Sequence, residues 1–522
     1  MLTVYLLDQA KMARFYKLPL TKPYFPRSAL SAGNLEYWIG HQEQIDRVVR
    51  GLAASNDTHY LITGYPGVGK SSFVSRAIAE WRKVCAAQGI SRVLIFNLHF
   101  AQPQTPEEVV RRLIGKVYFA SVDGEFAPTK KLANRLELNY IQAYSKSLKE
   151  TQGETSTTES GTDAKLTLPA LTGFGGNLGA GSKESKGVSR SLEIQKEYNL
   201  NMATSDFESV LHLLTQAKSF ESGLFERIKR QFSRSRNDHI NSRTLFIFDQ
   251  MDDLGAVEQL DSFFNMPNAS FIVLGGPKLQ EETSSARERG VHVLDNFDEI
   301  YLPCRWNTAR EMLAPLVDSR TVSSRRYLDY SDYLNFCSQG LPRRLFAAMD
   351  RHTTRKGDHF YLGVSDSEQK RIKLCAELHR ILWKHRKDIL GSYIDSVLHP
   401  LRDKALRGAY HLTDRIFRVV EFSFQEANTV ATQMSATIMH PSRERVLRNL
   451  LKLFESYGML LKSSSGYRLS EGVLKQVKQI PDWLKDGFAD ANELLDEIRR
   501  LDEKVSSSVV DIDLTPRHRV PP

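Results

Sequence analysis

The sequence predicts an α/β fold, in which a three-layer domain with a parallel sheet is followed by a helical lid and a C-terminal winged-helix domain. Three observations predict this fold. Apolar segments typical of strands alternate with amphipathic helical segments across residues 36–306. Residues 307–355 and most of 365–456 show helical periodicity alone. Near the end, the stretch "GMLLKSSSGYRLS" alternates on both sides of a serine–glycine turn, as a wing hairpin does.

Size and composition fit a soluble protein of several domains. The chain has 522 residues, with 41% hydrophobic and 25% charged residues, which is ordinary for globular proteins. A net charge of +9 permits binding to nucleic acid or an anionic surface but does not require it. We find no signal peptide and no apolar run long enough for a membrane helix, so we expect a cytoplasmic protein without stable membrane association. The four cysteines lie far apart, which predicts reduced, mostly buried thiols: Cys85, Cys304, Cys337 and Cys375.

The first half of the α/β pattern follows an N-terminal arm. The arm, residues 1–35, is rich in aromatic residues and proline, and we expect it to lie over a domain as an extended segment. The predicted elements are helix 42–54, strand 59–63, helix 71–87, strand 92–100 and helix 105–120. Helix 105–120 carries acids in its first turn, as the amino-terminal end of a helix prefers.

An insertion interrupts this pattern at residues 150–200. A polar linker comes first, and apolar residues then recur on even positions from Leu166 to Ala180 and from Val188 to Tyr198. This alternation predicts a glycine-rich β-hairpin. Pro169 and the glycines oppose a role for it in a bilayer. The hairpin would contact a neighbouring subunit, DNA or a partner, or would be disordered until the protein assembles.

The second half of the pattern leads into the C-terminal domains. We predict a helix at 206–218 and strands at 244–249, 270–276 and 299–303. The predicted domains are the N-terminal arm, the α/β domain, the lid, the helical and winged-helix domain, and a C-terminal helix with a disordered tail: 1–35, 36–306, 307–360, 361–480 and 481–522.

The stretch "GYPGVGKSS" at 64–72 fits the pattern G-x-x-x-x-G-K-[ST], between a predicted strand and a predicted helix. Glycines let backbone N–H groups turn toward a phosphate, and the following helix directs its positive end at the same anion. Lys70 would bridge the β- and γ-phosphates, and Ser71 would coordinate Mg²⁺. The stretch therefore predicts a site for ATP with Mg²⁺, formed by Gly64, Tyr65, Pro66, Gly67, Val68, Gly69, Lys70, Ser71 and Ser72.

A second acid for the metal follows the strand at 244–249. Asp249 ends that strand and would hold Mg²⁺ with Ser71; the alternative is an acidic helix cap. Gln250 stands where many ATPases have a glutamate that polarises the attacking water. An amide orients a water but takes no proton from it, so Asp252 and Asp253 are the candidate bases. Slow hydrolysis is expected.

These segments resemble two groups of ATPases. "TLFIFDQMDDL" is similar to the Walker B motif of signal-transducing STAND ATPases, particularly the NACHT and KAP groups. "CSQGLPRRLF" at 337–346 resembles their Gly-x-Pro lid element, and also the sensor 2 helix of AAA+ ATPases of the origin-recognition and helicase-loading type. The resemblance implies that Pro342 and Arg343 reach the nucleotide, with Arg343 at the γ-phosphate.

The resemblance extends to three further segments. "IGHQEQIDRVV" at 39–49 is similar to the motif that opens the nucleotide domain, which implies that Ile39 and Gly40 pack on the adenine; His41 replaces the usual arginine. Gly275, Gly276 and Pro277 stand where a polar sensor 1 residue is usual, a second sign of slow turnover. In AAA+ rings, the segment "SSARERG" would supply an arginine finger to the neighbouring subunit. The candidates are Arg287 and Arg289, and the alternative is a solvated helix face.

The predicted winged helix has two interpretations. Its helix carries Arg443, Arg445, Arg448 and Lys452, which could contact the phosphates of duplex DNA in the major groove. In switch ATPases, however, such a domain often packs on the nucleotide domain and locks the ADP form. The segment "MHP" at 439–441 resembles the Met-His-Asp motif that contacts ADP in plant-type switches, with Pro441 in place of the aspartate.

Together, these features predict an AAA+/STAND-type ATPase that acts as an oligomerising nucleotide switch. Its expected partners are further copies of itself and an effector or sensor protein. Prokaryotic defence against phage or mobile DNA is the setting that the resemblance suggests. One alternative is a DNA-binding ATPase for loading or target selection, of the origin-recognition or transposition type. The other is a nucleotide-binding adaptor without turnover.

Overall fold

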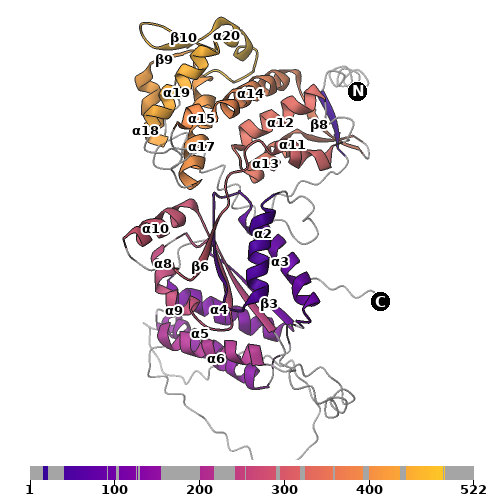
Figure 1. The fold of residues 1–522 in the computed structure, drawn as a ribbon, viewed down its shortest axis with the longest axis vertical. Helices are drawn as coiled ribbons and strands as arrows, with labels where there is room; N and C mark the ends of the chain where they lie inside the picture. Colours follow the sequence, from indigo (N-terminus) through magenta and orange to yellow (C-terminus); the bar gives the residue numbers. More distant parts are fainter. Residues whose placement is uncertain are drawn as a thin grey trace, which may run out of the picture. The chain divides into compact units, whose positions relative to one another are not determined.

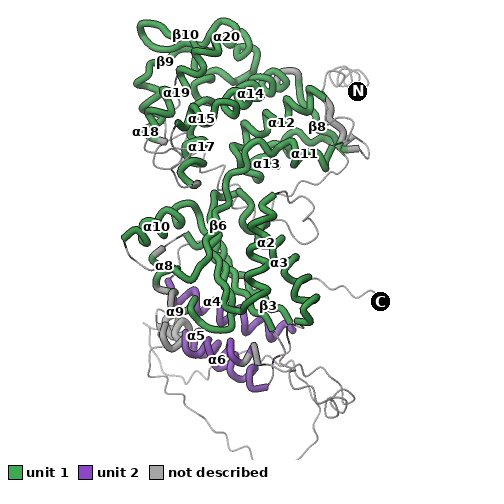
Figure 2. Tube along the Cα trace, in the orientation of Figure 1, with its two compact units in different colours: residues 1–103, 241–522 green, residues 104–240 purple. Residues whose placement is uncertain are grey.

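The computed structural model describes most of the chain and divides it into two compact units. The described residues are 16–20, 40–90, 92–100, 105–124, 126, 128, 130–153, 200–216, 242–252, 254–289, 294–317, 324–356, 359–391, 399–434, 443–485 and 487. Residues 1–103 and 241–522 form one unit, and residues 104–240 form the other (Figure 2).

A parallel sheet of five strands organises the α/β part of the first unit (Figure 1). The strands are β2 His59–Thr63, β3 Arg92–His99, β4 Ser242–Asp249, β5 Ser270–Gly275 and β6 Phe297–Tyr301. Their order is β3-β4-β5-β2-β6, and every neighbouring pair is parallel. All residues of β2 and β5 are buried, as expected for strands covered on both faces. The predicted α/β fold is therefore confirmed.

Helices lie on both sides of this sheet (Figure 1). They are α2 Gln42–Ala54, α3 Lys70–Ala87, α8 Leu254–Gln259, α9 Asp261–Phe264 and α10 Pro277–Glu288. Apolar residues spaced three and four apart on α2, among them Ile45 and Val49, share one core with Phe73 and Trp81 of α3 and with Ile272 of the sheet. The packing places the amino-terminal end of α3 directly after the carboxyl end of β2.

The predicted lid is helical up to His352. Its helices are α11 Ala309–Leu313, the short 3-10 helix η2 Ala314–Leu316, α12 Arg325–Ser338 and α13 Pro342–His352. The predicted helical periodicity of 353–355 is wrong, because β7 Thr353–Lys356 and β8 His359–Val364 form a hairpin there. The β-branched pair Thr353 and Thr354 favours a strand at the point where the helix ends.

Part of the N-terminal arm adds a strand to this hairpin. β1 Tyr16–Leu20 pairs antiparallel with β8, in the order β1-β8-β7. Pro19 cannot donate to a ladder, and β1 accommodates it because β1 is an edge strand. The five described arm residues are therefore extended, as predicted.

The C-terminal part has the helix and strand order of a winged helix. Its elements are α14 Asp366–Lys384, α15 Arg386–Leu390, α17 His399–Ile416, β9 Glu421–Phe422, α18 Phe424–Met434, α19 Arg443–Ser456, β10 Leu460–Lys462, β11 Tyr467–Leu469 and α20 Glu471–Val477. The wing strands β10 and β11 pair antiparallel, and β11 also pairs with β9. One hydrophobic cluster runs from Ala309 to Trp483, so the lid and the winged helix share a core. The domain boundaries stay predictions.

In its described residues, the second unit contains three helices, α4 Pro106–Val122, α5 Lys130–Gly153 and α6 Leu200–Gln216. Thr105 caps α4 by accepting from the Glu108 N–H, at the predicted start. Arg135 of α5 pairs with Asp206 of α6 at 2.5 Å. The sequence pattern missed α5, which includes residues 150–153 of the predicted linker. The rest of that linker, the predicted hairpin and the C-terminal tail lie outside the described residues.

Two further features concern the hydrophobicity of the helices and the state of the cysteines. Within the described ranges, the structure contains no helix with the length and hydrophobicity needed to span a bilayer. All four cysteines are free thiols; Cys85, Cys304 and Cys375 are buried and Cys337 is half-buried, as predicted.

Candidate nucleotide-binding site

The predicted site residues meet at the carboxyl edge of the parallel sheet. The register places Thr63 beside Gly275 and Tyr301, and His99 beside Asp249, all at strand ends. Open parallel sheets bind ligands outside the carboxyl ends of their strands. Thr63, His99 and Asp249 therefore lie at the edge where such a sheet binds its ligands.

The loop 64–69 needs glycine at positions where the backbone is left-handed and crowded. Gly64 has φ 153°, and an added Cβ would lie 2.7 Å from the Leu302 carbonyl oxygen. Gly67 has φ 82°, and a Cβ there would lie 3.2 Å from the Cβ of Arg343. Gly69 has φ 107° and directly precedes α3, so the loop turns into the helix within one residue. This geometry leaves backbone N–H groups at the start of α3 for an anion.

Lys70 occupies the inside of this loop. Its Nζ donates to the carbonyl oxygens of Gly64 at 2.7 Å and Tyr65 at 3.4 Å. Burial lowers the pKa of Lys70 to about 8, against the opposing effect of the Asp252 and Asp249 carboxylates. This half-buried ammonium donates its hydrogen bonds to neutral carbonyls, so it can accept a further anionic partner. A triphosphate would supply the missing negative charge.

Ser71 and Asp249 meet as the metal hypothesis requires. The Ser71 hydroxyl donates to Asp249 Oδ2 at 3.1 Å, although 178 positions separate the two residues. A hydroxyl and a carboxylate are oxygen ligands of the kind that Mg²⁺ prefers, together with substrate phosphates. Among the described residues, no three His, Cys, Asp or Glu side chains gather into a protein-only metal site. The two ligands therefore fit Mg²⁺ that is completed by phosphate and water.

His99 is a site residue that the sequence did not indicate. Its Nδ1 lies 3.8 Å from Asp249 Oδ2, and a hydrogen bond to Asp249 raises the pKa of His99. The only available signal was its position as the last residue of the strand before the one that carries Asp249. A protonated His99 would compete with the metal for the same carboxylate.

The residues after Asp249 form a constrained turn. Gln250 is exposed and has φ 67°, an uncommon conformation for a residue with a side chain. The Asp252 carboxylate accepts from the Gly276 N–H and helps to keep Lys70 protonated. Gly276 stands at the predicted sensor 1 position, so a backbone N–H takes the place of a polar side chain there. Asp253 lies outside the described residues.

The lid reaches the phosphate-binding loop through its Gly-x-Pro turn. Pro342 is the first residue of α13, and the Arg343 N–H donates to the Gly67 carbonyl oxygen at 3.3 Å. The positive charge of Arg343 also contributes to lowering the pKa of Lys70, so the guanidinium lies close enough to Lys70 to affect it electrostatically. The structure brings Pro342 and Arg343 to the loop.

A guanidinium that the sequence did not indicate lies beside Gly40. Gly40 has φ 81°, and an added Cβ would lie 2.5 Å from Nη2 of Arg305. Burial and the charge of Arg305 together lower the pKa of His41 to about 4. The histidine is therefore neutral, and Arg305 supplies a cation close to where the resemblance expects one. Ile39 lies outside the described residues.

The two candidate finger arginines have different surroundings. Arg287 is held within the chain, because Nη1 lies 2.8 Å from Glu299 Oε1 and Nη2 donates to the Leu294 carbonyl at 3.0 Å. Arg289 is exposed, and its Nε donates to the Ser285 carbonyl oxygen at 3.1 Å. It lines an open cavity of about 640 Å³ between α8 and α10.

The cations on α19 also differ from one another. Arg448 pairs with Glu444 and stacks on Phe424, with its guanidinium carbon 4.5 Å from the ring centroid. Arg443 donates to the Thr432 hydroxyl at 3.1 Å. Arg445 and Lys452 are exposed. The opposite face, Leu447, Leu450, Leu451 and Phe454, is buried in the core as predicted.

Several solved structures are similar to this chain over most of its length. The Walker-type ATPase paby2304 of Pyrococcus abyssi is 13% identical, with 87% of this chain and 98% of that chain covered and a TM-score of 0.33. The ORC2 protein of Aeropyrum pernix, in ADPNP–ADP complexes, is 10% identical, with 94% and 100% covered and a TM-score of 0.32. The ORC1 protein of Aeropyrum pernix in complex with DNA is 10% identical, with 92% and 97% covered and a TM-score of 0.30. No family model and no curated protein matches the chain.

Proposed function

We propose that this chain is an AAA+/STAND-type ATPase that binds ATP with Mg²⁺ at the loop 64–71 and uses the nucleotide as a conformational switch. One observation carries the proposal. The Ser71 hydroxyl, in the first turn of α3, and the Asp249 carboxylate, at the end of β4, lie 3.1 Å apart beside the Lys70 loop. A glycine turn without a ligand would not require a distant acid at this place.

Each residue of the site has a separate role in this proposal. The N–H groups at the start of α3 and the Lys70 ammonium hold the β- and γ-phosphates. Ser71 and Asp249 would hold Mg²⁺, which neutralises phosphate charge when it is bound. The Asp252 carboxylate accepts from the Gly276 N–H, and this fixed position supports a role for it in orienting water. Gln250 cannot accept a proton, and slow turnover is therefore part of the proposal.

A slowly hydrolysing switch needs a structure that responds to the γ-phosphate. Arg343 contacts the loop at Gly67 and belongs to the lid, whose core is continuous with the winged helix. A ligand shifts such an equilibrium only through contacts that differ between the two states. Arg343 is the residue that would make such a contact. Oligomerisation would then place Arg289 near the nucleotide of a neighbouring subunit. The resemblance to STAND ATPases favours prokaryotic defence as the setting.

Nucleotide binding by Lys70→Ala tests the proposal. We expect Mg²⁺–ATP affinity to fall at least tenfold, because the variant loses the cation that faces the phosphates. Lys83→Ala is the matched control, since Lys83 lies exposed on the same helix. Calorimetric titration with ATP and ADP measures both variants. Equal affinities for the wild type and Lys70→Ala would overturn the assignment of the loop.

Duplex DNA binding is a second candidate function, because exposed Arg445 and Lys452 lie on α19 of a complete winged helix. Phosphate contacts would make the affinity fall steeply with salt, and Arg445→Ala would lower the log–log slope by about one unit. Arg448→Ala serves as the comparison, since Glu444 already pairs with Arg448. A wild-type protein that ignores duplex DNA at low salt, with and without ATP, would eliminate this function.

A further inference from the structure

Helix α17 carries an unusual row of polar side chains on its buried side. Asp403, Arg407, His411 and Arg415 follow one another at intervals of four residues, so they form one ridge along the helix. Their exposed fractions are 1%, 3%, 8% and 5%. We call these four residues the α17 polar ridge. Buried polar groups are retained only where they find partners or serve a purpose.

Asp403 fixes the ridge to the segment that leaves β6. Its carboxylate accepts from the Tyr301 hydroxyl at 3.0 Å, the Cys304 N–H at 2.7 Å and the Trp306 indole N–H at 3.1 Å. Three donors on one carboxylate make a rigid attachment. The first turn of α17 therefore stays with the carboxyl edge of the sheet.

Arg407, one turn further along, contacts the phosphate-binding loop itself. Its guanidinium carbon lies 4.5 Å from the ring centroid of Tyr65, the second residue of the loop. Arg407 makes no hydrogen bond and no ion pair with any residue that the structure describes, and its Nε is buried without an acceptor. A desolvated cation over an aromatic face is strongly held. Arg407 is therefore in direct contact with the Tyr65 ring.

His411 reaches the same loop by a second route. Its Nδ1 lies 3.2 Å from Nε2 of Gln339, whose Oε1 accepts from Arg344 at 3.3 Å. Gln339 has φ 50° and belongs to the turn directly before α13. The next turn carries Arg343, which donates to the Gly67 carbonyl. The ridge thus contacts the loop at Tyr65 directly and at Gly67 through the lid.

The other side of α17 belongs to the winged helix. Leu406, Ala409 and Tyr410 lie in the core cluster that also contains Leu447 and Leu450 of α19. A rotation or shift of α17 would therefore move α19 with it, because packed interiors do not deform continuously.

We propose that α17 couples the phosphate-binding loop to the winged helix, and that Arg407 is a positioning residue that sets the conformation of the loop through Tyr65. The inference rests on the proposed nucleotide site. A nucleotide that moves the loop changes the stack, and the stack in turn changes nucleotide affinity, because coupling between two sites is reciprocal.

The test compares Arg407→Met and Tyr65→Leu, which remove the charge or the ring, with Arg407→Lys and Tyr65→Phe, which keep them. The readouts are the affinities for Mg²⁺–ATP and Mg²⁺–ADP, and amide hydrogen exchange of α18 and α19 with and without nucleotide. We expect Arg407→Met and Tyr65→Leu each to change the ratio of the two affinities about fivefold or more, the low end of typical coupling. Nucleotide should no longer alter exchange in α19. The double variant should add nothing further, since both changes remove one interaction.

Controls separate this inference from the proposed function. Lys404→Gln changes a cation on the same helix that lies off the ridge, and it should behave as the wild type. If the wild type binds no nucleotide, the proposed function and this inference both fail. If the wild type binds and Lys70→Ala does not, unchanged affinities and an unchanged exchange response in Arg407→Met would overturn this inference alone. Should Arg407→Met not fold, the contrast between Tyr65→Leu and Tyr65→Phe decides in the same way.

Discussion

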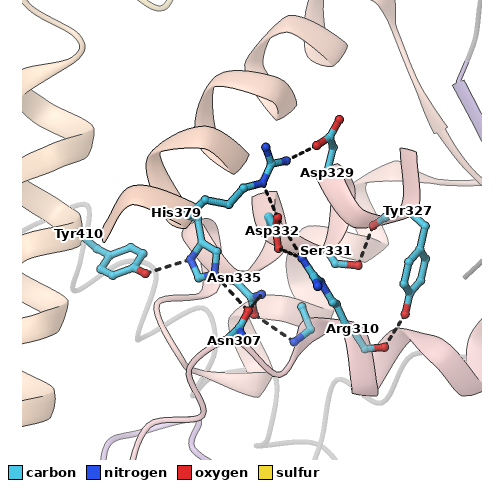
Figure 3. Close-up of polar contacts among 11 residues, drawn as sticks. Asn307, Arg310, Tyr327, Asp329, Ser331, Asp332, Asn335, His379 and Tyr410 are labelled. Carbon is cyan, nitrogen blue, oxygen red and sulfur yellow. Dashed lines mark hydrogen bonds and ion pairs between the residues drawn. The ribbon is translucent and has the colours of Figure 1, made fainter. Parts of the chain in front are cut away.

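The lid holds a buried charge and the phosphate-binding loop a half-buried one, and the two regions pair these charges differently. In the lid, Asp332 is 1% exposed and accepts from Arg310 at 3.0 Å and from Arg380 at 2.7 Å (Figure 3). Arg380 also pairs with Asp329. In the loop, the ammonium of Lys70 donates to two neutral carbonyls. The lid matches each of these charges with an opposite charge, whereas the loop leaves a cation for a ligand.

The histidines of the two regions show the same contrast. His379 of α14, which packs against the lid, is enclosed between the Tyr410 hydroxyl at 2.9 Å and the side-chain oxygen Oδ1 of Asn307 at 3.5 Å, and burial lowers its pKa to about 4 (Figure 3). His99 at the sheet edge lies next to Asp249, and its pKa is raised. Where every polar group has a partner within the protein, as around Asp332 and His379, the network holds the helices together. Where a group lies at the sheet edge, as His99 and Asp249 do, it can exchange its partner for a bound substrate. A structural charge therefore differs from a functional one less in how deeply it is buried than in whether side chains of the protein already pair with it.

The largest expected effect is on stability, from a change in the ion pairs of Asp332. Asp332→Ala should lower the free energy of unfolding by about 3 kcal/mol, the low end of the range for a broken buried pair, because both arginines are half-exposed and can be hydrated. Chemical denaturation measures it, with Asp329→Ala as the milder comparison. Folded Asp332→Ala should still bind nucleotide with wild-type affinity. A loss of affinity without a loss of stability would contradict the structural role.

The next effect concerns the open site. Asp249→Asn should reduce Mg²⁺-dependent hydrolysis about a hundredfold or more, since the carboxylate that holds the metal is lost. Stability should change by less than about 1 kcal/mol, because the side chain is partly exposed and the amide can still accept from Ser71. Phosphate release and thermal unfolding are measured on the same sample. Unchanged hydrolysis would remove Asp249 from the site.

A smaller effect is expected in the pH dependence of nucleotide affinity, because Lys70 titrates in the loop. Lys70 has a pKa of about 8 in the nucleotide-free loop, and bound phosphates raise it, so binding takes up a proton above that pH. Nucleotide affinity should then fall as pH rises, by up to about tenfold per unit of pH. Burial raises the pKa of Tyr65, which stays neutral in this range. Lys70→Arg keeps its charge and should give a flat profile; a flat wild-type profile would show that Lys70 is protonated throughout.

The smallest effects separate two arginines of α10. Arg287→Ala should destabilise the protein by about 1 kcal/mol, through loss of its pair with Glu299. Arg289→Ala should leave stability within about 0.5 kcal/mol of the wild type, as for other exposed sites. If Arg289 acts on a neighbouring subunit, ATPase activity should be lost in the variant and partly return on mixing with Asp249→Asn protein. Absence of complementation, together with a monomer in ATP, would argue against the finger.

The local parts of this protein could be predicted from the amino-acid sequence. It predicted the phosphate-binding loop, the strand that ends at Asp249, the parallel sheet and the apolar face of α19. Each of these depends on residues within one or two turns or strands, because glycine spacing and hydrophobic periodicity act over short distances along the chain.

The tertiary structure alone decided which distant groups meet this loop. It placed Arg305 beside Gly40, Arg407 on Tyr65 and His99 beside Asp249, and it paired arm strand β1 with β8. Tyr65 and Arg407 lie hundreds of positions apart, and neither has a local pattern that indicates the other. Such contacts follow from how apolar faces pack together, and packing determines which buried cations find an acid and which are left for a ligand.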